Sequence, residues 1–251
     1  MQLVKQLSIP VIILAAIIGI IFVPAIPQDI HYHNFSDQRS LFGIANCFNV
    51  ISNIPYLFIG VAGLYVLITR PLLAINQALR YIYMTFFAGV ALVSFGSGYY
   101  HLSPSNDSLV WDRLPIAISL MAFFTIVLAE FINEQLARKL FLPLIATGLA
   151  SVIYWYWSET QQQGDLRLYI LVQFLPMILI PVILLMYPSR FDNRHYYWLI
   201  IACYGLAKLL ELGDGAVFGG LGFVSGHSLK HLASALAPYL FYLYLSRRHT
   251  V

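Results

Sequence analysis

Polar side chains gather between two apolar runs in the segment FGSGYYHLSPSNDSLVWDRLPI, residues 95–116. Ser97 and His101 are four residues apart, so they would share one face of a helix. Asp112 opens the next apolar run, and Asp107 lies in the turn between the two runs. An imidazole can bind a metal ion, a carboxylate can move a proton and a hydroxyl can stabilise an oxyanion. The segment therefore predicts part of an active site, with Asp107 as a turn residue.

A second histidine pair, His227 and His231 in SGHSLKHLASA, has the same four-residue spacing. Two histidines at i and i+4 of a helix can both reach one metal ion. With His101 they would form a three-histidine site with a fourth position open to water, which is the arrangement of catalytic zinc. We expect Asp112 to take or orient the water proton and Ser97 to donate a hydrogen bond to a developing oxyanion.

Each of these residues taken singly also has a structural interpretation. A lone intramembrane histidine is more often a hydrogen-bonded packing residue than a ligand. A serine is a common small packing residue between membrane helices, and an aspartate can complement the dipole at a helix N-terminus. Their combination favours a functional site, because ionisable residues at membrane depth are costly.

The composition is that of an integral membrane protein. Of the 251 residues, 60% are hydrophobic and 10% are charged, whereas a soluble domain is about half apolar and a quarter charged. The net charge of +3 is too small to indicate binding to nucleic acid. Cys47 and Cys203 both lie within apolar runs, which predicts buried thiols rather than a disulfide or a thiolate metal site.

Apolar runs long enough to cross a bilayer, which takes about 20 residues per helix, make up most of the chain. They cover residues 7–27, 44–69, 81–101, 112–131, 140–157, 166–187, 196–214 and 227–246. Short connections predict one compact, all-α bundle. We interpret residues 1–28 as an additional, uncleaved N-terminal transmembrane helix and residues 29–251 as a seven-helix catalytic domain. A cleaved signal peptide is the alternative for the first run.

Basic residues are unevenly divided between the two ends of these predicted helices. With a cytoplasmic N-terminus, Arg39, Arg113 and Arg167 face outward, and the cytoplasmic side receives Lys5, Arg70, Arg80, Arg138, Lys139, Arg190, Arg194, Arg247 and Arg248. The positive-inside rule then predicts that both termini are cytoplasmic. The unusual polar residues, Asn46, Asn49 and Asn53 among them, would all meet the outer face. The short loops are typical of bacterial proteins, so we expect an inner-membrane protein whose site faces the periplasm.

The order of the motifs resembles that of the alkaline ceramidases, which belong to the CREST superfamily of seven-helix membrane hydrolases. The matching residues are Ser97-x-x-x-His101, Asp112 in WDRLPI and His227-x-x-x-His231, and NCFNVISNIPY is similar to the first core helix of that family. The resemblance covers most of residues 30–246.

The resemblance implies a zinc-dependent hydrolase of a membrane lipid. His101, His227 and His231 would hold Zn²⁺, Asp112 would orient or deprotonate the water, and Ser97 would stabilise the oxyanion. The bond cleaved would be the N-acyl amide of a ceramide-like lipid, giving a sphingoid base and a fatty acid.

Calcium is a further implication of the resemblance, because the eukaryotic ceramidases bind it through an acidic N-terminal segment. Here the corresponding segment is DIHYHNFSDQRSLFGIAN, with Asp37 and Asn46 as the candidate ligands. Calcium takes six to eight oxygen ligands, and this segment has fewer acids than its counterpart in the family. The alternative is a solvated loop in which Asp37 pairs with Arg39.

Lys208, Glu211 and Asp214 recur at three-residue intervals near the outer end of a predicted span. They could position a lipid head group, although a structural ion-pair network is the interpretation we favour.

The same residues are compatible with other functions. An acyl-ester or lipid-remodelling hydrolase could use the same residues, and a seven-helix receptor resembling the progestin and adiponectin receptors could hold the same metal. A transporter would place its polar residues near mid-membrane, and here they cluster at one face. The sequence makes no prediction of oligomeric state.

Overall fold

The computed structural model describes residues 2–70 and 74–250, and side chains from residue 7 onward within these ranges. Some predicted features lie outside the described residues. They are the side chain of Lys5 and, within the two predicted domains, residues Met1, 71–73 and Val251. The described chain is helical, with only two isolated β-bridges, Leu41–Ile44 and Phe191–Thr250.

The elements follow the predicted apolar runs. They are α1 (Gln2–Phe22), η1 (Ile30–His33), α2 (Cys47–Ile51), α3 (Ile54–Thr69), η2 (Gln77–Leu79), α4 (Arg80–Leu102), α5 (Asn106–Val127), η3 (Leu128–Ile132), α6 (Glu134–Thr160), α7 (Arg167–Met186), α8 (His195–Leu212), α9 (Asp214–Leu221) and α10 (Gly226–Arg247). The run at 44–69 forms two helices with a break at Ser52 and Asn53, and the run at 112–131 ends in the π-helical turn η3.

The prediction of an all-helical membrane bundle is confirmed. By length and hydropathy, the segments able to cross a membrane are Cys47–Thr69, Gln77–Leu102, Asn106–Ile132, Glu134–Thr160 and Arg167–Met186, with Leu7–Phe22 as a shorter apolar helix. α8 and α10 are outside this set. Each carries lysine, histidine or glutamate side chains, and these lower its mean hydropathy. The count of seven core helices plus one stays a prediction.

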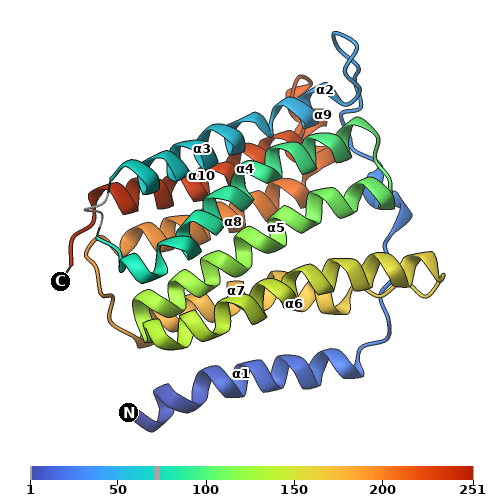
Figure 1. Ribbon diagram of the computed structural model, residues 1–251. Helices are drawn as coiled ribbons and strands as arrows, with labels where there is room; N and C mark the ends of the chain where they lie inside the picture. The colour runs from blue at the N-terminus through green and yellow to red at the C-terminus, as the bar shows by residue number, and fades with distance from the viewer. Residues whose placement is uncertain (1, 71–73, 251) are drawn as a thin grey trace.

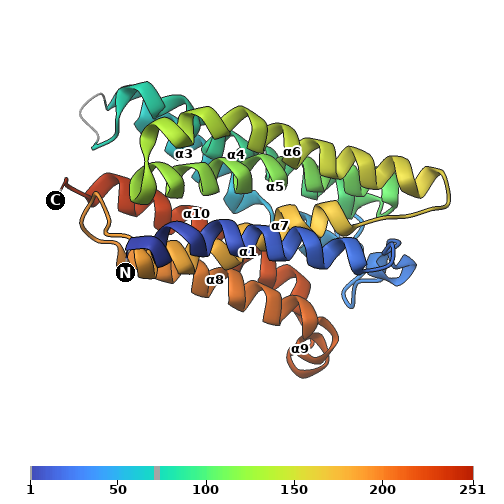
Figure 2. The same ribbon diagram turned by 90° about the horizontal axis from the view of Figure 1, so that it is seen from below.

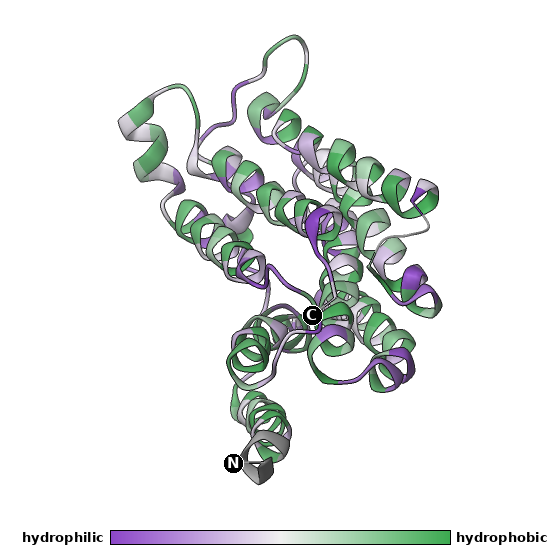
Figure 3. Cartoon of the chain, turned by 90° about the vertical axis from the view of Figure 1, so that its left-hand side faces the viewer, coloured by the Kyte–Doolittle hydropathy of each residue, from purple (hydrophilic) through white to green (hydrophobic). Residues whose placement is uncertain are grey.

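The long helices lie side by side, with both termini at one end of the bundle (Figure 1). α4 packs between α3 and α5, α10 packs on α8 and α3, and α1 lies against α7 at one edge (Figure 2). Much of the helix ribbon has the colour of hydrophobic residues when the bundle is viewed from one end (Figure 3). Large apolar side chains such as Phe58, Leu142 and Leu185 are exposed, as a lipid environment requires. Cys47 and Cys203 are buried and free, as predicted.

The two ends of the bundle differ. The helix ends and loops that contain Arg70, Arg80, Arg138, Arg190 and Arg248 lie at the end with both termini (Figure 1). The segment between α1 and α2, together with α2 and α9, lies at the opposite end. The structure therefore separates the basic-rich end from the end where the unusual polar residues were expected. The orientation of these ends in a membrane stays a prediction.

Close backbone contacts bring the site-bearing helices together. A Cβ atom on Gly96 of α4 would lie 2.0 Å from the carbonyl oxygen of Trp111 in α5, so only glycine allows this approach. A Cβ on Gly226, the first residue of α10, would lie 2.3 Å from the carbonyl oxygen of Leu210 in α8. Both glycines are next in sequence to a candidate site residue, Ser97 and His227.

Candidate metal centre and pocket

Three buried imidazoles meet at the end of the bundle opposite the termini. α4 contributes His101 from its last turn, and α10 contributes His227 and His231 from its first two turns. The centroids of every pair of rings are 4.9 Å apart. One candidate ligand atom from each ring lies within 4.8 Å of the others. The structure thus brings together the three histidines that the sequence selected, across 126 residues between His101 and His227.

One pair of these nitrogens has the spacing of two ligands on a tetrahedral metal ion. Nε2 of His101 and Nε2 of His227 are 3.4 Å apart. Two nitrogens bound to one tetrahedral zinc at 2.0–2.1 Å are separated by about 3.3–3.4 Å. The Nδ1 atom of His101 is buried and has no hydrogen-bond partner among the described residues, so this ring is not held as an ordinary packing histidine would be.

Neighbouring side chains fix the orientation of the rings. The Nδ1 atom of His231 lies 2.8 Å from the Ser52 hydroxyl, which leaves Nε2 free to face the other histidines. Phe35, from the segment before α2, packs on the rings of His101 and His227 at centroid distances of 4.7 and 4.4 Å. Metal-binding histidines are commonly oriented by hydrogen bonds of this kind through their second ring nitrogen.

The start of α10 is fixed by two oxygen acceptors. The Ser225 hydroxyl accepts a hydrogen bond from the backbone amide of Ser228, as an N-cap does. The Asp214 carboxylate accepts from the backbone amide of His227 at 2.7 Å and from that of Ser36 at 2.9 Å. Asp214 therefore joins α9, α10 and the segment after η1 close to the centre.

The predicted asparagines line the same end of the bundle. Asn46 donates to the carbonyl oxygen of His101 at 2.8 Å, and Asn49 accepts from the Ser228 hydroxyl at 2.7 Å. The amide nitrogen of Asn53 is 3.4 Å from Nδ1 of His231. All three contacts hold backbone or side chains of the centre in place.

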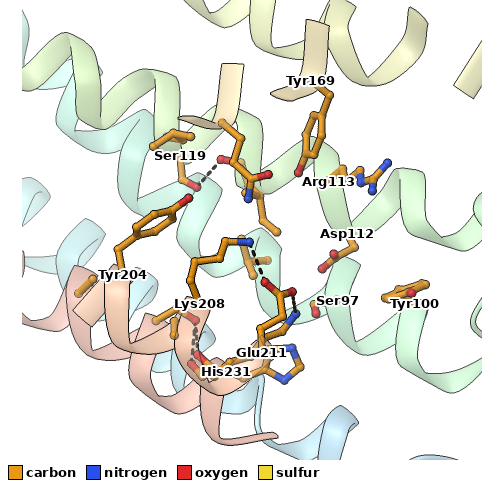
Figure 4. Close-up of a pocket in the computed structure, with 18 of the residues that line it drawn as sticks. Ser97, Tyr100, Asp112, Arg113, Ser119, Tyr169, Tyr204, Lys208, Glu211 and His231 are labelled. Carbon is orange, nitrogen blue, oxygen red and sulfur yellow. Dashed lines mark hydrogen bonds and ion pairs between the residues drawn. The ribbon is translucent and has the colours of Figure 1, made fainter. Parts of the chain in front are cut away.

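Ser97 and Asp112 lie beside the histidines on facing helices. Figure 4 shows the Ser97 hydroxyl next to the Asp112 carboxyl, and the two side chains interact. Both line one pocket together with His101, His227 and His231. The structure thus gathers the five residues selected for chemistry around one space.

The pocket has a volume of about 540 Å³, which is within the usual range for small-molecule sites. Some of its lining residues are polar and others are apolar. Its polar part is lined by the residues just described. Its apolar part runs between α4, α5, α7 and α8, lined by Phe86, Val90, Phe123, Met177 and Ile200. The segment after α1, Ile26 to Gln28, also forms part of the wall, so the predicted domain boundary at residue 28 falls within the pocket lining.

Lys208 and Glu211 line this pocket, whereas Asp214 does not. Glu211 accepts from Lys208 at 2.7 Å and from Lys230 at 2.5 Å, which joins α8 to α10 (Figure 4). The predicted three-residue set is therefore divided between an ion-pair network and the N-terminal contact of α10.

The candidate calcium ligands are engaged with protein groups. Both carboxylate oxygens of Asp37 accept from the Arg39 guanidinium, at 2.8 and 2.7 Å. The Arg39 hydrogen bonds hold the pKa of the Asp37 carboxyl below its usual value. The ion pair of the alternative interpretation is therefore present, but Asp37 is 2% exposed and so is buried rather than solvated.

Sequence reasoning missed Ser52, Phe35 and the place of Arg113 in the pocket wall. Ser52 lies in NVISN, directly before Asn53, so its position among helix-end polar residues was a usable signal. Phe35 lies in an irregular segment, and no periodic pattern indicates which way such a side chain faces.

Comparison with known proteins bears on these findings. A model of the family described as Ceramidase matches residues 39–210. The chain belongs to the ceramidase family. Membership implies a hydrolase that acts on an amide bond, with a membrane lipid of the ceramide type as the substrate class. The matched segment includes Ser97, His101 and Asp112 and ends before His227 and His231.

No curated protein and no solved structure matches the chain. The assignment of His227 and His231 to the metal centre of this ceramidase family member therefore rests on the geometry of the three rings.

Proposed function

We propose that the protein is a zinc-dependent hydrolase that cleaves the N-acyl amide bond of a ceramide-like membrane lipid into a sphingoid base and a fatty acid. Family membership supports the amide-hydrolase class. The observation that carries the metal dependence is the trio of buried imidazoles with ligand atoms within 4.8 Å of one another. Three neutral nitrogen donors are a ligand set typical of catalytic zinc.

His101, His227 and His231 would hold the ion. Bound zinc supplies a Lewis acid that polarises a carbonyl and lowers the pKa of a water molecule. Ser52 keeps the Nε2 atom of His231 turned toward its neighbours. Phe35 covers two of the rings and excludes water from that side.

In the proposed reaction, Asp112 acts as the general base and then as the general acid. Its carboxylate lies in the polar part of the pocket next to Ser97 (Figure 4). It would accept a proton from the attacking water and deliver it to the amide nitrogen, which leaves as an amine. The Ser97 hydroxyl would donate a hydrogen bond to the carbonyl oxygen as negative charge develops there.

The shape of the pocket supports a lipid substrate. A long alkyl chain can lie against Phe86, Phe123 and Met177 while the amide meets the polar residues. Burial of each methylene group contributes about 0.8 kcal/mol to binding. We also propose that the polar end faces the outside of the membrane, with both termini cytoplasmic, because basic residues concentrate at the other end.

The test is zinc content together with fatty-acid release from ceramide by the purified protein. The wild-type protein is expected to contain about one zinc per chain and to release fatty acid. Asp112→Asn is expected to keep the zinc and lose at least 100-fold in release, the scale of general acid–base catalysis. Asp107→Asn is the matched control, because Asp107 is exposed on the same helix and contacts Tyr156 rather than the pocket.

An ester with the same acyl chain separates the amide hydrolase from the ester hydrolase. Faster cleavage of the ester alone would contradict the amide assignment. Wild-type protein that binds no transition metal would contradict the zinc-dependent mechanism. Binding of zinc without cleavage of either the amide or the ester would instead favour the function of a seven-helix receptor.

A further inference from the structure

Arg113 is a buried cation in the wall of the pocket, beside Asp112 in the sequence. Its side chain follows Asp112 on α5 and is 5% exposed. Nη2 donates to the side-chain oxygen of Gln28 at 2.6 Å, and Nη1 has no hydrogen-bond partner among the described residues. No ion pair to Arg113 occurs in the part of the chain that the structure describes.

Aromatic rings surround the guanidinium. It lies 4.0 Å from the ring centroid of Trp155, 4.6 Å from that of Tyr169 and 5.8 Å from that of Tyr32. Such contacts hold the position of a cation and offset part of its desolvation. They give it no hydrogen-bond acceptor, so the free N–H groups of Nη1 remain unsatisfied.

The two lysines that line the pocket are differently placed. Lys208 and Lys230 are both paired with Glu211. A buried charge is normally paired or coordinated, because desolvation without a partner is costly. Arg113, Gln28, Tyr32 and Tyr169 all line the same pocket as the histidines. The unpaired donor therefore lies at the wall of the cavity in which the lipid is proposed to bind.

We infer that Arg113 is an anion-binding residue of this pocket, which receives a negatively charged group of the lipid ligand. Two sources have this chemistry: a phosphate or sulfate on the substrate head group, and the carboxylate of the released fatty acid. A guanidinium can donate two parallel hydrogen bonds to either kind of group. The inference rests on the proposed function for the identity of the ligand as a lipid.

A binding measurement tests the inference without requiring turnover. Dodecyl phosphate, dodecanoate and dodecanol are titrated into the purified protein in a non-ionic detergent, with heat or tryptophan fluorescence as the readout. We expect Arg113→Gln to weaken dodecyl phosphate or dodecanoate at least tenfold, as loss of a charged hydrogen bond does, and to leave dodecanol unchanged. A bound metal would contribute equally to the anion affinity of the wild-type protein and of Arg113→Gln. The difference in anion affinity between the two is therefore due to Arg113.

Two further variants separate binding from folding. Arg113→Lys keeps the charge and is expected to recover part of the lost affinity. Arg167→Gln removes a cation that pairs with Asp165 outside the pocket, and anion affinity should stay at the wild-type value. Equal affinity of the wild-type protein and Arg113→Gln for both anions would overturn the inference.

Measurements of substrate hydrolysis and of inhibition by fatty acid distinguish the two possible sources of the anion. A head-group anion predicts that the wild-type protein prefers a ceramide bearing a phosphate over the same ceramide with a free hydroxyl, and that Arg113→Gln abolishes the preference. A product carboxylate predicts instead that fatty acid inhibits the wild-type protein more strongly than Arg113→Gln. If no substrate is cleaved but the anion affinities differ, the proposed function fails and the anion site stands.

Discussion

The histidines of the candidate centre are each held by contacts that come from other helices. Ser52 at the end of α2 bonds to His231, Asn46 bonds to the backbone of His101, and Asp214 bonds to the backbone of His227. A ring whose second nitrogen is bonded cannot rotate freely, so less entropy is lost when it binds a metal. Metal affinity should therefore depend on residues that do not touch the metal.

Ser52→Ala is expected to lower zinc affinity about tenfold, because the second nitrogen of His231 loses its strongest partner. The measurement is competition for zinc against a chelator of known affinity. Ser119→Ala is the control, since the Ser119 hydroxyl bonds only to carbonyl oxygens of its own helix. Unchanged affinity in Ser52→Ala would show that Ser52 does not orient the ring.

Among individual residues, the sequence predicted those proposed to carry the chemistry better than those that hold them in place. His101, His227 and His231 were recognisable because each could be placed near a helix end by spacing alone. Ser52 was marked only by its position among polar residues at a helix end, and Phe35 was not marked at all. The contacts of both arise only when the segments before α3 fold across the ends of α4 and α10. Arg113 was recognised as a basic residue, but its burial among three rings is a property of tertiary structure.

Among the elements, the irregular segment between α1 and α2 covers the centre and contains an ion pair whose arginine also contacts the loop before α10. Arg39 bonds to Asp37 and also donates to the carbonyl oxygen of Phe223, before α10. The pKa of Asp37 is lowered in the folded protein by its hydrogen bonds with Arg39. This pair therefore stabilises the folded state above the ordinary carboxyl pKa of 3.8, and the effect is lost as pH falls through the lower folded value.

Arg39→Gln is expected to lower the melting temperature at pH 7, and the difference from wild type should shrink as pH falls below 3.8 toward the lower folded pKa of Asp37. The measurement is thermal unfolding of both proteins in detergent between pH 7 and pH 3. Asp37→Asn should reproduce the loss at pH 7. A melting-temperature difference that stays constant across this range would contradict the role of the Asp37 charge.

The contact between α4 and α5 places Ser97 and His101 opposite Asp112, and it depends on Gly96. Gly96→Ala is expected to destabilise the protein by about 1–3 kcal/mol, because the added methyl group overlaps the backbone of Trp111. Gly98→Ala is the matched control on the same helix, since its Cβ would meet no atom within 4 Å. Thermal unfolding of the two variants checks this, and equal stability would show that α5 moves away at no cost.

Over the whole molecule, polar groups are buried at both ends of the bundle, and they serve different purposes. The end with the termini holds Glu130 of η3, which accepts hydrogen bonds from Tyr83, Tyr197 and Tyr244 at 2.7–2.9 Å and pairs with Arg248. Arg248 also lies 3.9 Å from the ring centroid of Phe191. Protein groups satisfy the Glu130 carboxylate, although Nε of Arg248 has no hydrogen-bond partner among the described residues. None of these residues lines the pocket that contains the histidines, so the network serves to hold the C-terminal end of the chain to the bundle.

Arg248→Met is expected to destabilise the protein by about 3–5 kcal/mol, because it leaves the buried Glu130 carboxylate without its cation. Zinc content should remain at the wild-type value, since the network and the histidines lie at opposite ends. Arg247→Met is the control, because the neighbouring Arg247 is exposed. Loss of zinc in Arg248→Met at a temperature where the protein is folded would contradict the separation of the two ends.

The architecture was largely predictable because a membrane restricts a chain to helices of nearly fixed length. The apolar runs gave the positions of most helices to within about five residues, but α5 and α6 each begin six residues before their predicted runs, at Asn106 and Glu134. The break between α2 and α3 and the π-helical turn were not predictable. Both occur where Ser52 and Glu130 satisfy contacts with distant helices, and apolar periodicity carries no signal of such contacts.

The central claim is that this member of the ceramidase family hydrolyses a lipid amide with a metal held by three histidines. The most direct measurement is fatty-acid release from ceramide by the purified protein before chelation, after chelation and after zinc is returned. We predict that chelation abolishes release, that about one equivalent of zinc restores it, and that His231→Ala shows no recovery. Release that continues at the wild-type rate in metal-free protein would contradict the account.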